Sequence, residues 1–234
     1  MSTTTKNSAI ISKIMAATAV VTMAFLVFAG KGNQANTEAN VALPNPAIDA
    51  PLASTPGKQT AVLAGGCFWG IQAVFQHVKG VKEATSGYSG GSVASPDYEE
   101  VSSGNTGHAE SVKITFDPSQ ISYGQLLKIF FSVAHDPTQL NRQGPDSGTQ
   151  YRSVIFYSNE EQQRIAHAYI SQLEQAKLFP APIVTQIVSL KAFYVAEAYH
   201  QNYATLHPDN PYIAINDAPK VNHLRLQLPD LYKK

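Results

Sequence analysis

From Gln59 onward, hydrophobic positions follow in turn the two-residue period of a strand and the longer period of a helix. Short apolar or alternating runs predict strands, and apolar residues spaced three or four apart predict helices. The predicted strands cover residues 60–64, 111–116, 151–157 and 183–190. Helices are predicted for residues 68–78, from Ser122 to Val133, after a capping box of Ser158 and Glu161, and for residues 197–206. From His207 the chain is predicted to be irregular.

This order of elements predicts the fold class. Strands and helices interleave, but the strand at 111–116 is half polar and a long loop region surrounds residues 87–107. Both features favour an α+β fold over a doubly wound parallel sheet. We therefore expect a single domain built as a two-layer sandwich, with a mixed sheet and helices packed against it.

The N-terminal 58 residues are predicted to lie outside that domain. No residue between Ile14 and Gly30 is charged, and Lys6 and Lys13 precede the apolar run, as in an export signal or an uncleaved membrane anchor. The following segment is rich in Pro, Asn and Ala, which favours a flexible linker. We expect a protein of the periplasm or cell envelope with three parts: residues 1–30 as signal or anchor, 31–58 as linker, and 59–234 as the folded domain.

Composition narrows the possible functions. The 234 residues carry 17 basic and 17 acidic side chains, and the basic residues are dispersed, so no cationic surface for nucleic acid is expected. Contact with a membrane is expected only through the N-terminal segment. Cys67 is the one cysteine, which excludes an intrachain disulfide and a multi-thiolate metal site. It is either an inert buried thiol or a reactive centre.

The position of Cys67 favours reactivity. Gly65 and Gly66 precede it between a predicted strand and a predicted helix, so the thiol is expected at a helix N-terminus. Free backbone N–H groups there favour the thiolate and are expected to lower the thiol pKa below about 8.5. The glycines are expected to let a substrate approach the backbone closely.

The sequence around this cysteine carries a family resemblance. Gly66-Cys67-Phe68-Trp69-Gly70 resembles the signature of peptide methionine sulfoxide reductases of the A type. The resemblance extends from Thr60 into the C-terminal region, so it covers the predicted domain, 59–234. It continues through Gly87-Tyr88-Ser89-Gly90-Gly91, Tyr98-Glu99-Glu100-Val101, Gly107-His108-Ala109-Glu110, His135-Asp136-Pro137-Thr138-Gln139, Arg142-Gln143-Gly144, Asp146-Ser147-Gly148-Thr149-Gln150-Tyr151-Arg152-Ser153 and Tyr199-His200-Gln201-Asn202-Tyr203.

The resemblance implies a reaction and its residues. The Cys67 thiolate attacks the sulfur of methionine sulfoxide, methionine leaves, and the cysteine becomes a sulfenic acid. Glu110 matches the carboxylic acid that protonates the sulfoxide oxygen, which requires a raised pKa. Tyr98 and Tyr151 match phenols that hydrogen-bond the same oxygen, and Asp146 matches an acidic position that helps to set the electrostatics of the site.

The resemblance also implies a substrate. Phe68 and Trp69 match the walls of the pocket for the sulfur-bound methyl group, and Gly66 is expected to contact substrate. Such a pocket selects one epimer of the chiral sulfoxide, and the resemblance implies the S epimer, in free methionine or in oxidised proteins. No cofactor or metal is required.

The chain lacks the second, resolving cysteine that many family members carry, and Ser102 and Ser103 occupy a loop where another thiol would be possible. The sulfenic acid is therefore expected to be reduced by an outside thiol. A thioredoxin-like protein, a glutaredoxin-like protein or a small thiol would serve.

Other interpretations remain open at the level of sequence. Residues 87–91 fit the Gly-x-Ser-x-Gly elbow of serine hydrolases, with Ser89 as nucleophile, although no helix pattern follows. A cysteine hydrolase or acyltransferase would use Cys67 with His108, His135 or His200 as base. A non-catalytic envelope binding module is a third possibility. His200 and His207 lack the spacing of a zinc motif, so a hydrogen-bonding or structural role is favoured for them.

Overall fold

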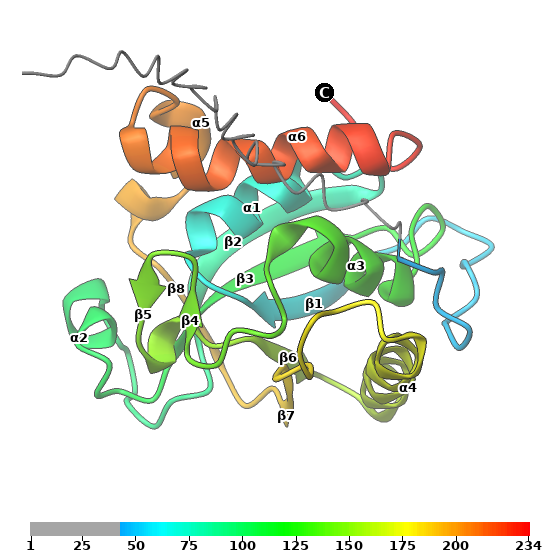
Figure 1. The fold of residues 1–234 in the computed structure, drawn as a ribbon, viewed down its shortest axis with the longest axis horizontal. Helices are drawn as coiled ribbons and strands as arrows, with labels where there is room; N and C mark the ends of the chain where they lie inside the picture. The colour runs from blue at the N-terminus through cyan, green and yellow to red at the C-terminus, as the bar shows by residue number, and fades with distance from the viewer. Residues whose placement is uncertain (1–42) are drawn as a thin grey trace, which may run out of the picture. The chain divides into compact units, whose positions relative to one another are not determined.

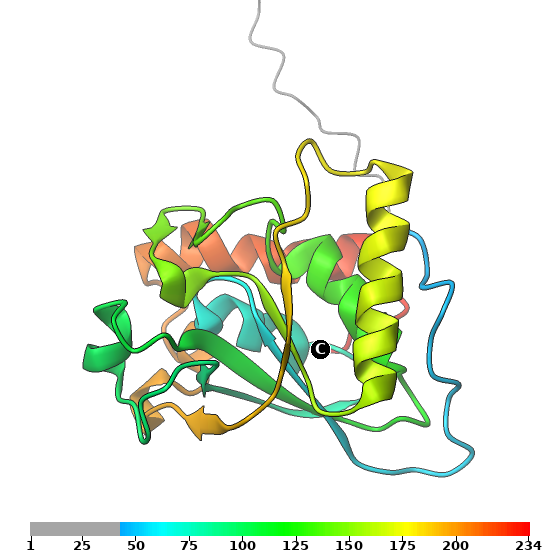
Figure 2. The same ribbon diagram turned by 90° about the horizontal axis from the view of Figure 1, so that it is seen from below.

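A computed structural model describes residues 43–234 of the chain (Figures 1 and 2). The predicted signal or anchor, 1–30, and residues 31–42 of the predicted linker lie outside the described residues. Between residues 43 and 234, no helix is both long and apolar enough to cross a membrane.

Six strands form one mixed sheet in the order β7-β6-β1-β3-β2-β8. Neighbouring strands pair antiparallel, except that β6 and β7 are parallel. A separate two-stranded ribbon joins β4 and β5. The strands are β1 (Gln59–Ala64), β2 (Val81–Ser89), β3 (Ala109–Phe116), β4 (Arg142–Gln143), β5 (Asp146–Ser147), β6 (Val154–Tyr157), β7 (Gln186–Ser189) and β8 (Phe193–Val195).

Helices cover one face of this sheet. Helix α1 packs on β2 and β3, α6 runs beside α1, and α4 packs against α3 and β6 (Figure 1). The α-helices are α1 (Phe68–Gln76), α2 (Tyr98–Ser102), α3 (Tyr123–Ile129), α4 (Glu160–Ala176), α5 (Tyr203–Leu206) and α6 (Ala218–Gln227). Short π-helical turns span Phe130–Ala134 and Ile213–Asp217, and 3-10 turns span Thr149–Tyr151 and Ala198–His200.

The main hydrophobic core lies between this sheet face and the helices. The alternating residues Val112, Ile114 and Phe116 of β3 are fully buried against side chains of α1, α3 and α4. A smaller cluster on the other face includes Val62 and Phe156. The prediction of an α+β sandwich with a mixed sheet in a single domain is confirmed.

Several predicted elements shift in the structure. The strand predicted from Tyr151 begins only at Val154, because residues 149–151 form a 3-10 turn. The capping box of Ser158 and Glu161 is wrong, since Asn159 caps α4 by accepting a hydrogen bond from the Gln162 N–H at 2.9 Å. The helix predicted for 197–206 divides into a 3-10 turn and α5, with Asn202 between them at φ 57°.

Three larger elements were not predicted at all. Strand β2 lies in the sheet between β3 and the edge strand β8, and α2 lies in the loop region that follows it. The irregular C-terminal segment predicted from His207 is wrong, because α6 packs beside α1 and buries Leu224 completely.

Residues 43–58 contain no helix or strand, in keeping with their proline spacing, but they are packed against the domain. Leu43 is buried in the main core, and the carbonyl oxygen of Pro44 accepts a hydrogen bond from Tyr169 Oη at 2.9 Å. Asp49 accepts a hydrogen bond from the Gly124 N–H at 2.8 Å, at the N-terminus of α3. A carboxylate at this position favours the helix because it compensates free N–H groups.

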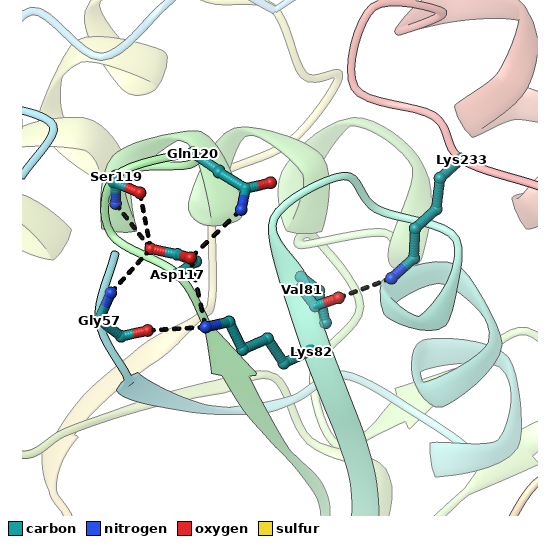
Figure 3. Close-up of polar contacts among 7 residues, drawn as sticks. All are labelled: Gly57, Val81, Lys82, Asp117, Ser119, Gln120 and Lys233. Atoms are coloured by element: carbon teal, nitrogen blue, oxygen red, sulfur yellow. Dashed lines mark hydrogen bonds and ion pairs between the residues drawn. The ribbon is translucent and has the colours of Figure 1, made fainter. Parts of the chain in front are cut away.

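The end of this segment is fixed by Asp117, which follows β3 (Figure 3). Its Oδ1 accepts hydrogen bonds from the Gly57 N–H at 3.0 Å and from Ser119 Oγ at 2.8 Å. Lys82 Nζ lies 3.2 Å from Asp117 Oδ2 and donates to the Gly57 carbonyl at 3.1 Å. The Gly57 N–H, then Ser119 and Lys82, hold the pKa of Asp117 well below its usual range. Burial opposes this effect only in part.

We predict that Asp117→Asn lowers the melting temperature by several degrees at neutral pH. Because the pKa of Asp117 is lowered by folding, its stabilising effect is present above the unfolded pKa of about 3.9 and is lost as the pH falls towards the folded value. The difference between wild type and variant should therefore shrink below about pH 4. Thermal unfolding at pH 7 and at low pH measures it. The same substitution at the exposed Asp209 is the control, and a difference independent of pH would contradict the prediction.

Candidate functional site

Cys67 lies where β1 ends and α1 begins, at the N-cap of the helix. The two preceding residues must be glycine for reasons of space and backbone. A side chain at Gly65 would meet the His135 ring at 2.8 Å, and Gly66 has φ 100° with Gln143 in the way at 2.5 Å. The two glycines therefore allow a tight turn that packs closely against His135 and Gln143. Gly66 faces Gln143 and does not line the cavity beside Cys67, and its contact with substrate stays a prediction.

Sheet register places Glu110 next to this turn. Leu63 of β1 pairs with Val112 of β3, so Glu110 lies two residues beyond the pair, where β1 gives way to the turn. Glu110 shares the strand phase of Val112 and therefore faces the helices. Its Oε2 accepts a hydrogen bond from the Phe68 N–H at 3.0 Å, and the side chain is 2% exposed.

The first turn of α1 thus serves two reactive groups. The N–H of Phe68 donates a hydrogen bond to the Glu110 carboxyl group, and the N–H of Trp69 acts on the Cys67 thiol by lowering its pKa. Both N–H groups are among those that an α-helix leaves free at its N-terminus.

A cavity of about 210 Å³ opens beside these groups. It brings together every predicted site residue except Gly66, and it adds a third tyrosine that sequence reasoning missed. The lining residues are Cys67, Phe68, Trp69, Tyr98, Glu110, Asp146, Tyr151 and Tyr212.

The apolar wall is made by Phe68 and Trp69. Phe68 is fully buried, whereas the indole of Trp69 stacks on Tyr203 with ring centroids 3.9 Å apart. Trp69 Nε1 donates a hydrogen bond to His200 Nδ1 at 3.1 Å, which fixes the orientation of the indole. His200 thus has a hydrogen-bonding role, as the sequence analysis favoured.

The polar wall carries three phenols and a second carboxyl group. Burial first, and then the charge of Glu110, raises the pKa of Tyr98 to about 12 and moves the pKa of Tyr151 upward. Both phenols therefore stay protonated and remain hydrogen-bond donors at neutral pH. Tyr212 donates to Asp146 Oδ2, so Asp146 is held by a side chain from the C-terminal region.

Glu110 is a protonated acid at neutral pH. Burial raises its pKa to about 8, against the lowering effect of the Phe68 N–H, and the charges of Asp146 and Asp217 add to the rise. Because this pKa lies above neutrality, the protonated form of the carboxyl group predominates at pH 7. The raised pKa that the resemblance implied is present.

The expected low pKa of Cys67 is wrong. Burial raises the pKa of the thiol well above its usual value, and the charges of Glu110 and Asp217 raise it further. The Trp69 N–H and the charge of Lys220 lower it, but they do not outweigh burial. The sequence argument identified a real helix effect and missed the larger cost of an ion in a buried position.

Asp217 and Lys220 form an ion pair at 3.0 Å that the sequence did not reveal. Asp217 is fully buried, and its Oδ1 takes the space that a side chain at Gly70 would need in the first turn of α1. These two charges act on the Cys67 thiol in opposite directions.

The serine and the histidines of the two hydrolase interpretations form hydrogen bonds elsewhere. Ser89 is the last residue of β2 and donates a hydrogen bond to the Ala192 carbonyl at 3.0 Å. No helix follows it directly, since α2 begins only at Tyr98, so it is not at a strand-to-helix elbow. His108 contacts the Val93 carbonyl at 2.8 Å, and His135 contacts the Phe130 carbonyl at 3.0 Å. His200 accepts from Trp69. This arrangement disfavours both hydrolase interpretations.

Comparison with known proteins gives the same result at the level of sequence and fold. The family described as peptide methionine sulfoxide reductase matches residues 59–230. Two relatives named peptide methionine sulfoxide reductase MsrA 2 are similar along most of their length. The protein from Mesorhizobium japonicum is 61% identical over 77% of this chain and 93% of its own, and that from Synechocystis is 51% identical over 82% and 90%.

Solved structures of related proteins share the fold. Methionine sulfoxide reductase A of Corynebacterium diphtheriae is 36% identical, with a TM-score of 0.57 over 71% of this chain and 84% of its own. Reduced Mxr1 from Saccharomyces cerevisiae is 30% identical, with a TM-score of 0.58 over 69% and 94%.

We predict that Cys67 reacts with iodoacetamide as a thiol of raised pKa when no substrate is bound. The midpoint of the rate against pH should lie above about 8.5, and Glu110→Gln should move it to lower pH because it removes a nearby negative charge. Because the chain has a single cysteine, the measured alkylation is that of Cys67. Glu99→Gln, a matched change at an exposed position, should leave the midpoint in place. A wild-type midpoint below 8 would contradict this view of the site.

Proposed function

This chain belongs to the peptide methionine sulfoxide reductase family, A type, and on that premise we propose that Cys67 and Glu110 together reduce methionine sulfoxide. The protein is an oxidoreductase that returns methionine sulfoxide to methionine and so repairs oxidised proteins. The single observation that carries the residue assignment is the shared N-terminus of α1, where Cys67 is the N-cap and the Phe68 N–H donates a hydrogen bond to the Glu110 carboxyl group.

The first step joins the two groups. The Cys67 sulfur attacks the sulfoxide sulfur while Glu110 gives its proton to the sulfoxide oxygen, and the thiol proton replaces it on Glu110. In the resulting sulfur–sulfur adduct the hydroxyl group passes from the substrate sulfur to the Cys67 sulfur. The substrate's sulfur–oxygen bond and the new sulfur–sulfur bond break, methionine leaves, and Cys67 carries the oxygen as a sulfenic acid. Two electrons pass from the cysteine sulfur to the substrate sulfur, and no proton is gained from solvent.

The remaining walls select and orient the substrate. The protonated phenols of Tyr98 and Tyr151 donate hydrogen bonds to the sulfoxide oxygen as negative charge develops on it. Phe68 and Trp69 enclose the methyl group. The Asp146 carboxyl group, on the polar wall of the cavity, contributes to the electrostatics of the site. Because methyl group and oxygen are placed at once, the pocket accepts one epimer, and membership of the A-type family assigns the S epimer, in free methionine sulfoxide or in a polypeptide.

Recycling requires a thiol from outside the chain. An external thiol attacks the sulfenic acid, water leaves, and a mixed disulfide forms; a second external thiol then restores the Cys67 thiol. A thioredoxin-like protein, a glutaredoxin-like protein or a small thiol fits this chemistry. The proposal includes export: the uncharged run of residues 14–30 supports a repair enzyme of the periplasm or cell envelope, free or held by its N-terminal segment.

We predict that the protein reduces methionine S-sulfoxide and leaves the R epimer unchanged, with dithiothreitol as reductant. Cys67→Ser should abolish turnover. Without reductant, each wild-type molecule should form one methionine and gain the mass of one oxygen, about 16 Da, on Cys67. Chiral chromatography of a dabsylated substrate and intact-mass measurement give both results. Turnover by Cys67→Ser, or equal turnover of both epimers, would overturn the proposal.

We predict that Glu110→Gln lowers kcat/KM by about 10²- to 10⁴-fold, because the variant lacks the proton donor. The acid is present below a pKa of about 8 and is lost above it, so wild-type kcat/KM should fall as the pH rises through that value. The fall should be absent from the Glu110→Gln profile. If kcat/KM of Glu110→Gln fell at alkaline pH as it does in the wild type, the proton donor would be a group other than Glu110.

A further inference from the structure

Tyr98 reaches the cavity from an element that needs an anchor. It is the first residue of α2, a helix of five residues in the connection between β2 and β3. The N-cap of this helix, Asp97, is exposed, and its side chain accepts only the Glu100 N–H. The Tyr98 N–H instead donates to Oε1 of Glu197 at 2.8 Å, from a part of the chain 99 residues away.

Glu197 is itself fixed to the sheet. Its Oε2 accepts a hydrogen bond from Tyr88 Oη at 2.9 Å, and Tyr88 is fully buried in β2, directly opposite Glu110 of β3. The carboxylate therefore connects β2 with the first residue of α2. Burial alone would raise the pKa of Glu197, but backbone N–H groups and the Tyr88 hydroxyl hold it below its usual value.

The backbone of Glu197 supports the other side of the cavity. Its carbonyl oxygen accepts a hydrogen bond from the His200 N–H at 2.9 Å, and the His200 ring packs on Tyr98 with centroids 4.3 Å apart. Glu197 does not line the cavity. It contacts groups that do.

We propose that Glu197 is a positioning residue for the reductase step, which holds the Tyr98 hydroxyl at the sulfoxide oxygen by fixing the backbone of Tyr98 to the buried Tyr88. The inference rests on the proposed function of Tyr98 and goes beyond it, because it assigns a role to a carboxylate that never touches the substrate. The role depends on hydrogen-bond geometry, and the negative charge is not required for it.

A pair of variants separates geometry from charge. Glu197→Ala removes both contacts and should lower kcat of the reductase step by about 10- to 100-fold. Glu197→Gln has an oxygen for the Tyr98 N–H and an amide N–H for the Tyr88 hydroxyl, so it should stay within about threefold of wild type. Formation of methionine without reductant, in one turnover, measures this step apart from recycling. A Glu197→Gln variant as slow as Glu197→Ala would overturn the positioning role.

A double-mutant cycle tests whether the effect passes through Tyr98. Tyr98→Phe should lower kcat by about 100-fold, and adding Glu197→Ala to it should cost less than about threefold more. Losses that multiply would show that Glu197 acts elsewhere, as a merely structural residue would. Glu99→Gln on the exposed side of α2 is the matched control and should keep wild-type kcat.

Loss of folding is measured separately. Glu197→Ala leaves the buried Tyr88 hydroxyl without its acceptor, so thermal unfolding is recorded for each variant, and Tyr88→Phe with Glu197→Ala restores a satisfied core. If that pair remains as slow as Glu197→Ala, the loss follows the Tyr98 contact, which supports the inference. A wild-type kcat for the pair would overturn it. Activity of Cys67→Ser would instead overturn the proposed function itself.

Discussion

The site depends on two neighbouring N–H groups at the start of α1. The Phe68 N–H donates a hydrogen bond to the Glu110 carboxyl group, and the Trp69 N–H lowers the pKa of the Cys67 thiol, so a single helix terminus serves an acid and a nucleophile together. Burial then acts on both groups in the same direction, because it disfavours the charged form of each. The raised pKa of Glu110 makes it a proton donor at neutral pH, and the same burial keeps the Cys67 thiol protonated until a substrate arrives.

Placement of these groups follows from backbone constraints. Antiparallel pairing of β1 with β3 brings Glu110 beside the end of β1, and the alternation along β3 turns it towards the helices. Gly65 and Gly66 allow the turn to pass between His135 and Gln143. The reactive cysteine is therefore located by a rigid strand, a crowded turn and a helix start, which is a more precise support than a loop provides.

The sequence identified Cys67 from local pattern, because an apolar run, two glycines and a helical period are all adjacent to it. The phenols and Glu110 came only from the family resemblance, although the alternation of β3, extended back to residue 110, would have placed that carboxyl group on the helix face. Strand β2 escaped detection because its small and polar residues are satisfied by neighbours far away in sequence. Tyr212 and the thiol pKa depend on packing that no local pattern contains.

Electrical neutrality explains why one buried cavity can hold so many ionisable groups. In the resting state the thiol, the Glu110 carboxyl group and the phenols of Tyr98 and Tyr151 are all protonated, so the interior near the sulfur holds no unpaired ion from these four groups. A thiolate is needed only as the bond to substrate sulfur forms, when the Trp69 N–H and Lys220 favour it. Since the thiol proton replaces the one that Glu110 gives away, the reaction moves protons within the site and never requires a lasting buried charge.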